Sequence, residues 1–271
     1  MQGLTEALQT FCDDLKRQER AKNTISSYET DIRQFIDFLQ GREMGKACAV
    51  EYKKHIAGLA TSTQNRKLIA LNKFFRYIGR EDCTVKVIKI QRNDLDDVMS
   101  VSDYQRCLKY AQIMGKAKSW HIMKTLAGTG IRISELKYIT IEAVKAGKAL
   151  VDNKGKRRVI PISKELAKIL KAYAKTENVA TGPLFISASG KPLDRTYIHN
   201  ELKSIAGRAR VKKSRVHAHS FRHLFALAFL KAGNNIAELA DILGHSSLET
   251  TRIYLRTSTE EKAAKMGALG L

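Results

Sequence analysis

The chain has 271 residues, with 48 Lys and Arg against 27 Asp and Glu, a formal net charge of +21 and a pI near 9.9. Such an excess is typical of proteins that bind polyanions, because Lys and Arg neutralise phosphates and release counterions. No apolar run approaches the roughly 18 residues that span a bilayer, the start of the chain lacks the order of a secretory signal, and the four cysteines are widely spaced. These features exclude membrane-spanning and disulfide-rich proteins and indicate a cytoplasmic protein that binds nucleic acid.

The first 80 residues predict four helices. Apolar residues recur at i, i+4, i+7 and i+11 from Leu4 and again from Tyr28, which is the stripe of an amphipathic helix. We expect Thr24 to cap the second of these helices. A shorter helix over about 50–59 should follow. The fourth helix carries its stripe at Leu68, Leu71, Phe75 and Ile78.

The pattern changes between residues 80 and 100, where helical periodicity is lost and charged and β-branched residues are frequent. Such a stretch is typical of a linker between domains. We therefore expect a helical domain over 1–85, a linker over 86–100 and a second domain over 101–271.

The second domain begins with helical patterns at about 102–114 and 119–128 and a short helix near Ser134. Three segments with strand character follow, joined by Gly147 and by the turn at 154–156. The three segments are 140–144, 149–153 and 157–162. They predict a small antiparallel sheet with Lys154 at the tip of a hairpin. The fold class is therefore mainly α with a small antiparallel β-sheet.

The remainder of the chain returns to helical patterns, over about 163–175, 194–209, 219–231 and 236–243. Asn235 with Glu238 has the spacing of a capping box, as does Ser246 with Glu249. The second box should open the helix that carries Tyr254.

A scattered set of six side chains carries the chemistry. One tyrosine, two arginines, one lysine and two histidines are what is needed to attack a phosphodiester without a metal. The tyrosine supplies an oxygen nucleophile, the cations stabilise charge developing on the phosphate, and the lysine and one histidine move protons. The six are Arg132, Lys154, His219, Arg222, His245 and Tyr254.

These residues lie in four motifs, TGIRISEL (129–136), NKGKRRVIP (153–161), HSFRH (219–223) and LGHSSLETTRIY (243–254). In this order the motifs resemble those of the tyrosine recombinases, the phage-integrase and Xer group, and the resemblance covers nearly the whole chain. It implies a helical core-binding domain followed by a mixed α/β catalytic domain, together forming a C-shaped clamp on DNA, without an arm-binding domain. The chain departs from the family at Ser220, where Asp is common.

The resemblance also implies a role for each residue. Arg132 and Arg222 would bind the non-bridging oxygens of the scissile phosphate, and His245 would donate a hydrogen bond to it. His219 is the candidate base and Lys154 the candidate acid, with Lys156 as its rival. Tyr254 would form a 3′-phosphotyrosine. Glu135 would orient active-site side chains, and His223 is open to either a chemical or a structural role.

The implied function is site-specific DNA recombination through a Holliday junction, with no cofactor and no metal. The expected partners are double-stranded DNA with inverted core half-sites, three further copies in a homotetramer docked through the tail Met266–Leu271, and accessory directionality factors. The expected location is the bacterial cytoplasm, at the nucleoid.

Three alternatives remain at this stage. They are a type IB topoisomerase-like relaxation activity, a non-catalytic DNA-binding protein, and a metal-dependent nuclease built on His217, His219 and His223. The sequence does not identify the target DNA. It also does not distinguish integration, excision, inversion, transposition and dimer resolution, because all use the same chemistry.

Overall fold

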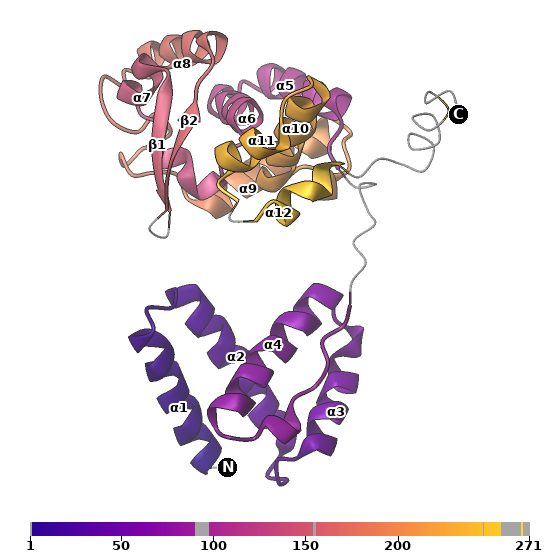
Figure 1. The fold of residues 1–271 in the computed structure, drawn as a ribbon. Coiled ribbons are helices and arrows are strands. Elements are labelled where there is room, and N and C mark those ends of the chain that lie inside the picture. Colours follow the sequence, from indigo (N-terminus) through magenta and orange to yellow (C-terminus); the bar gives the residue numbers. More distant parts are fainter. Residues whose placement is uncertain (1, 90–97, 154–155, 246, 256–266, 268–271) are drawn as a thin grey trace. The chain divides into compact units, whose positions relative to one another are not determined.

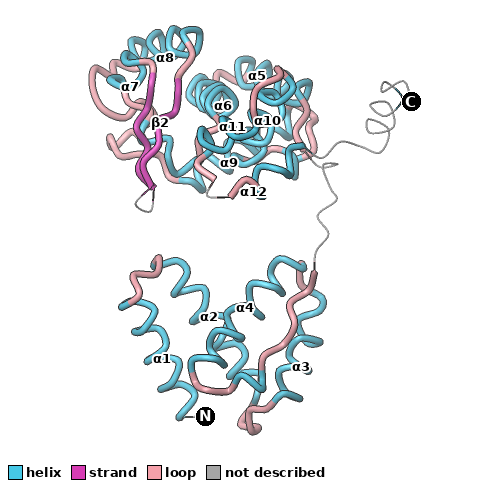
Figure 2. Tube along the Cα trace, in the orientation of Figure 1, coloured by secondary structure: helices cyan, strands magenta, loops and turns pink. Residues whose placement is uncertain are grey.

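The computed structural model describes residues 2–89, 98–153, 156–245, 247–255 and 267. The chain divides into two compact units, Met1–Asn93 and Asp94–Leu271. In the described part, both units are mainly helical, and the second also contains a two-stranded antiparallel sheet (Figures 1 and 2). The predicted fold class, mainly α with a small antiparallel sheet, is confirmed.

Unit 1 contains the four expected helices: α1 (Gln2–Arg17), α2 (Lys22–Leu39), α3 (Lys46–His55) and α4 (Thr61–Tyr77). Their apolar stripes meet in one core, where Phe11, Phe35 and Phe74 are buried. The prediction for Thr24 was wrong. Helix α2 begins at Lys22 after Ala21, so Thr24 lies in the first turn and its N–H binds the carbonyl of Ala21.

A short segment after α4 is held against that helix by side-chain amides. Asn72 pairs with both the N–H and the carbonyl of Val85, at 2.9 and 2.8 Å. Asn65 pairs in the same way with Ile88, at 2.8 Å for both bonds. This segment, which we call the strap (Thr84–Ile88), therefore has the backbone pairing of an edge strand although its partner is a helix.

Unit 2 is built around helices α6 (Ala117–Thr129) and α10 (Ala218–Lys231), which lie side by side at the centre of the unit (Figure 1). The other α-helices are α5 (Val101–Ile113), α7 (Ile141–Ala146), α8 (Lys164–Thr176), α9 (Arg195–Arg208), α11 (Ile236–Leu243) and α12 (Glu249–Arg252). Short 3₁₀ segments lie at Ile133–Tyr138 and Ile253–Leu255. Most predicted helices of this unit are confirmed to within a few residues.

One predicted strand, 140–144, was wrong: Thr140 is the N-cap of helix α7, and residues 141–144 lie within that helix. The β-branched residues favoured a strand, but the hydroxyl of Thr140 accepts from the N–H of Ala143 and caps a helix. Gly147, with φ +71°, then ends it in the left-handed conformation. Local capping therefore outweighs strand propensity here.

The other two predicted strands form the hairpin β1 (Lys148–Asn153) and β2 (Lys156–Pro161). In its register Val151 faces Arg158 and Leu150 faces Val159. Val151 is buried and Leu150 is exposed, so alternation places Arg158 on the inner face of the hairpin. The tip that carries Lys154 lies outside the described residues.

The predicted helix that carries Tyr254 takes a different form. Helix α12 has four residues, and a 3₁₀ segment continues it through Tyr254. Ser246 lies outside the described residues, and it is the hydroxyl of Ser247 that accepts from the N–H of Glu249.

Candidate active site

Arg222 lies at the centre of the candidate site, on α10, with only 1% of its surface exposed. Its Nη1 donates to the carbonyl of Gly130 at 2.8 Å, and its Nη2 donates to the carbonyl of Leu243. These carbonyls close the C-terminal ends of α6 and α11, where helix dipoles favour a cation. Burial, aided by the nearby charges of Arg132 and Arg158, lowers the pKa of Arg222 to about 10. The guanidinium therefore stays charged at neutral pH.

The two helix ends that hold Arg222 both finish in glycine. Gly130 has φ +62° and Gly244 has φ +64°, a conformation that residues with a Cβ rarely adopt. A Cβ at Gly130 would lie 2.5 Å from Cδ1 of Phe225, and one at Gly244 would lie 2.7 Å from Cδ of Arg158. The glycines of the TGIR and LGH motifs thus bring the two helix ends close to the arginines.

A buried carboxylate organises the neighbouring arginines. Glu135 accepts from the N–H of Arg132 at 3.0 Å and from its Nη1 at 3.0 Å. The same carboxylate accepts two bonds from Arg158, at 3.1 and 2.6 Å. Arg158 also donates to the carbonyl of Ile242 at 3.0 Å. Glu135 therefore links Arg132 to the hairpin, and Arg158 links the hairpin to the end of α11.

Sequence reasoning missed Arg158. It stands in the basic run KGKRR, where charge alone does not separate inward from outward side chains. The usable signal is the strand alternation, since Arg158 shares its face with the buried Ile160, whereas Arg157 is exposed and pairs with Asp152.

His245 joins this cluster through both ring nitrogens. Its Nε2 lies 3.0 Å from Nη2 of Arg222, and its Nδ1 lies 2.8 Å from Oγ1 of Thr251. Burial, with the charges of Arg222 and Arg132, lowers the pKa of His245 to about 4. The ring is therefore neutral at physiological pH.

The remaining predicted residues form a row of rings. The ring centroids of His219 and His223 are 4.7 Å apart, and those of His223 and Tyr254 are 5.2 Å apart. Burial and the charge of Arg222 lower the pKa of His219, so it is a neutral ring able to accept a proton. Tyr254 is 5% exposed, and burial raises the pKa of its phenol against the opposing effect of Arg222. His223 thus lies between the candidate base and the candidate nucleophile.

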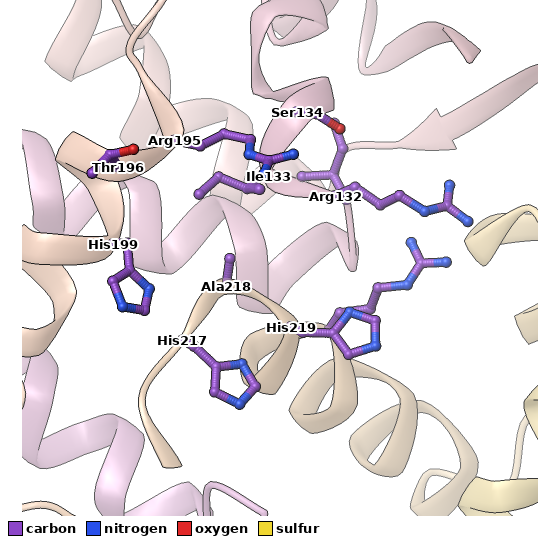
Figure 3. A pocket seen from close by; sticks show the side chains of 11 residues that line it. Arg132, Ile133, Ser134, Arg195, Thr196, His199, His217, Ala218 and His219 are labelled. Carbon is purple, nitrogen blue, oxygen red and sulfur yellow. The ribbon is translucent and has the colours of Figure 1, made fainter. Parts of the chain in front are cut away.

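A cleft of about 540 Å³ opens beside the arginines. Arg132, His219 and Arg222 line it together with Arg195, His199 and His217 from the starts of α9 and α10. Figure 3 shows His199 and His217 at one end and Arg132 with His219 at the other. His217 caps α10, since its Nδ1 accepts from the N–H of Ser220 at 3.2 Å. Three predicted site residues therefore face a space open to a ligand.

The structure brings five of the six predicted residues into one cluster: Arg132, His219, Arg222, His245 and Tyr254. The sixth, Lys154, lies outside the described residues, and its rival Lys156 starts β2 opposite Asn153. Within the described ranges, no group of three or more His, Cys, Asp or Glu is placed to hold a metal ion. The histidine spacing at 217, 219 and 223 thus gives no metal centre there. None of the helices that the structure describes is long and apolar enough to cross a membrane.

Two family models match this chain. The phage integrase family matches residues 95–261, and the phage integrase N-terminal SAM-like domain matches residues 8–82. The chain therefore belongs to the phage integrase family, as the sequence motifs predicted.

Curated relatives agree with this assignment. The tyrosine recombinase XerD of Rhizobium meliloti is 29% identical over 269 residues, which cover 89% of this chain and 86% of the relative. The tyrosine recombinase XerC of Pelobacter propionicus is 26% identical, covering 96% of this chain and 93% of the relative. These matches confirm the predicted class of enzyme, a tyrosine-type site-specific recombinase.

Solved structures share the fold. The Tn1549 transposon integrase in complex with transposon right end DNA has a TM-score of 0.75 at 20% identity, covering 98% of this chain and 99% of that one. The XerH site-specific recombinase in a post-cleavage complex with a palindromic difH substrate has a TM-score of 0.75 at 21% identity, covering 96% of this chain and 84% of that one.

Proposed function

We propose that this recombinase cleaves and rejoins double-stranded DNA through a transient bond between Tyr254 and a 3′ phosphate. The observation that carries the proposal is the convergence of Arg132, Arg222 and His245 beside the row His219–His223–Tyr254. Segments more than 100 residues apart in the chain meet there. They supply an oxygen nucleophile, cations for a phosphate and neutral imidazoles for proton transfer in one place.

The charge of the cluster suits an anion. Arg222 binds backbone carbonyls, which neutralise none of its charge, and the carboxylate of Glu135 is shared between Arg132 and Arg158. A phosphate in the cleft therefore meets guanidinium groups whose charge is only partly compensated. Their forked donors fit its non-bridging oxygens and act most strongly as charge builds up in the pentacoordinate transition state.

The proposed reaction exchanges one phosphodiester for another. The phenol oxygen of Tyr254 attacks phosphorus while its proton passes to His219, and the bond from phosphorus to the 5′ oxygen breaks. Lys154, with Lys156 as its rival, donates the proton that the 5′ oxygen takes up. Because burial raises the pKa of Tyr254, attack depends on a base at neutral pH. A 5′-hydroxyl of another strand reverses the steps, so rejoining needs no external energy source.

The wider assembly follows from the same proposal. Residues 1–85 would bind core DNA, residues 86–100 would link the domains, and residues 101–271 would carry catalysis. A homotetramer would act on two inverted-repeat sites through a Holliday junction, docked by the tail Met266–Leu271, in the bacterial nucleoid and with accessory directionality factors. The XerH and Tn1549 integrase complexes with DNA support this assignment of the partner.

The test is covalent capture on a nicked suicide duplex, chosen from a randomised inverted-repeat pool that the wild-type protein enriches. Tyr254→Phe should bind the duplex with unchanged affinity and form no covalent complex. Tyr77→Phe, an exposed tyrosine of unit 1, is the matched control and should behave like wild type. A covalent complex formed by Tyr254→Phe would overturn the assignment of the nucleophile.

Two further measurements separate the alternatives. Cleavage that persists in EDTA and leaves protein on the 3′ end argues against a metal-dependent nuclease. Relaxation of a supercoiled plasmid that lacks the enriched site should be slow for a recombinase and fast for a type IB topoisomerase. A protein that binds the site but never cleaves it would be an architectural binder.

A further inference from the structure

Thr251 is a buried residue to which the reaction above gives no role. It lies on α12, three residues before Tyr254, and 0% of its surface is exposed. Its hydroxyl oxygen is 2.8 Å from Nδ1 of His245. Thr251 therefore connects a predicted phosphate ligand to the segment that carries the nucleophile.

The contacts of His245 fix which nitrogen carries the hydrogen. A guanidinium has donors only, so at 3.0 Å from Arg222 the Nε2 atom of His245 must accept. A neutral ring that accepts at Nε2 carries its hydrogen at Nδ1. That N–H then donates to the hydroxyl of Thr251. Without a phosphate in the cleft, His245 is thus the Nδ1–H tautomer and its Nε2 is not available as a donor.

The proposed function requires the other tautomer. To donate to a phosphate oxygen, His245 must carry its hydrogen at Nε2, which leaves Nδ1 as a buried acceptor. A threonine hydroxyl can reverse its role by rotating its hydrogen, because it is both donor and acceptor. We propose that Thr251 is a positioning residue that accepts from His245 in the free enzyme and donates to it once the phosphate is bound.

The exchange conserves protons and charge. One proton leaves Nδ1 for water and one arrives at Nε2 from water, while Arg222 turns its Nη2 from His245 towards the phosphate. The hydroxyl rotation keeps Nδ1 paired in both states, which avoids leaving a buried polar atom without a partner. The inference deepens the proposed function and rests on it, because the second state exists only if a phosphate enters the cleft.

Three variants test it. Thr251→Val keeps the shape and removes the hydroxyl, Thr251→Ser restores a hydroxyl, and Thr250→Val is an exposed neighbour that serves as the matched control. On the suicide duplex, Thr251→Val should form the covalent complex roughly ten- to a hundredfold more slowly, by analogy with the loss of a partner that orients a metal-bound histidine. Thr251→Ser and Thr250→Val should stay close to wild type. A Thr251→Val rate equal to wild type would overturn the proposal.

A spectroscopic readout separates this role from a purely structural one. Nitrogen-15 NMR of His245 should show the Nδ1–H tautomer in the free wild-type protein and the Nε2–H tautomer in the Tyr254→Phe complex with DNA. An Nε2–H tautomer in the free protein, or a doubly protonated ring in the complex, would overturn the switch. If wild type forms no covalent complex at all, the proposed function fails, while the free-protein tautomer still tests the contact with Thr251.

Discussion

Gly130 should be among the least replaceable residues of unit 2, because it meets two constraints at once. Its φ of +62° ends helix α6, and a Cβ built on it would lie 2.5 Å from Cδ1 of Phe225 and 2.9 Å from Cδ2 of Leu243. We expect Gly130→Ala to destabilise unit 2 strongly. Gly233→Ala is the matched control, since Gly233 has φ +84° but nothing within 4 Å of its Cβ position.

The expected size follows from these two constraints. Placing an alanine in the left-handed region costs about 1–2 kcal/mol, and both variants share this cost. Forcing a methyl group into the ring of Phe225 adds about 1–3 kcal/mol, which applies only at Gly130. Gly130→Ala should therefore lose about 2–5 kcal/mol of unfolding free energy and Gly233→Ala about 1–2 kcal/mol.

Urea unfolding followed by tryptophan fluorescence measures the difference. The chain has a single tryptophan, Trp120 on α6, so the emission reports unit 2. With an m value of about 2 kcal/mol/M, a loss of about 3 kcal/mol lowers the urea midpoint by about 1.5 M. Gly233→Ala should lower it by less than about 1 M.

Two outcomes would refute this reasoning. Equal urea midpoints for Gly130→Ala and Gly233→Ala would show that the ring of Phe225 moves aside without lowering the unfolding free energy. Failure of Phe225→Leu to recover any stability in the Gly130→Ala background would show that the ring is not the source of the loss, because residues in contact should couple in a double-mutant cycle.

The remaining predictions use the same Trp120 readout. Arg158→Met should lower the unfolding free energy by about 3–5 kcal/mol, because it removes one of the arginines that pair with buried Glu135 in the described part of the chain. Arg157→Met, which breaks an exposed pair, should cost less than about 1 kcal/mol, and equal losses would contradict the role given to Glu135. Burial, together with nearby basic groups that include His219 and Arg222, lowers the pKa of His223 to about 4 from an ordinary value near 6.5. The unfolded chain therefore takes up this proton first, and stability should fall as pH drops from about 6.5 towards 4. His223→Gln should flatten that fall between about pH 6.5 and pH 4, and an unchanged slope would show that His223 does not contribute to it.

The helices were predictable where one apolar stripe and one capping residue agreed. Asn235 with Ile236–Leu243 is such a case, since the helix begins and ends where the sequence indicated. The prediction failed at 140–144, where β-branched residues favoured a strand but Thr140 and Gly147 fix both ends of a short helix. A six-residue segment has too little periodicity for its propensity to outweigh two caps.

The site was predictable in its residues and much less so in its contacts. The motifs located Arg222 and His245, because short stretches around them are distinctive. They did not show that carbonyls at the ends of two helices hold Arg222, since that depends on Gly130 and Leu243 meeting in three dimensions. The role of Thr251 could not be predicted for the same reason, because it depends on one buried contact with His245 and not on a sequence pattern.

The strap of unit 1 has a mechanical consequence. Asn65 and Asn72 are seven residues apart on a helix, about 10 Å, and Ile88 and Val85 are three residues apart in an extended chain, also about 10 Å. The two spacings match, and the strap runs antiparallel to α4. A pull on the chain beyond Ile88 would therefore load the bonds of Asn65 first, then the bond from Lys53 to the Lys86 carbonyl, then those of Asn72, and the helical core last. The hydrogen bonds of the strap would thus break before a force transmitted along the chain disturbs the core of unit 1.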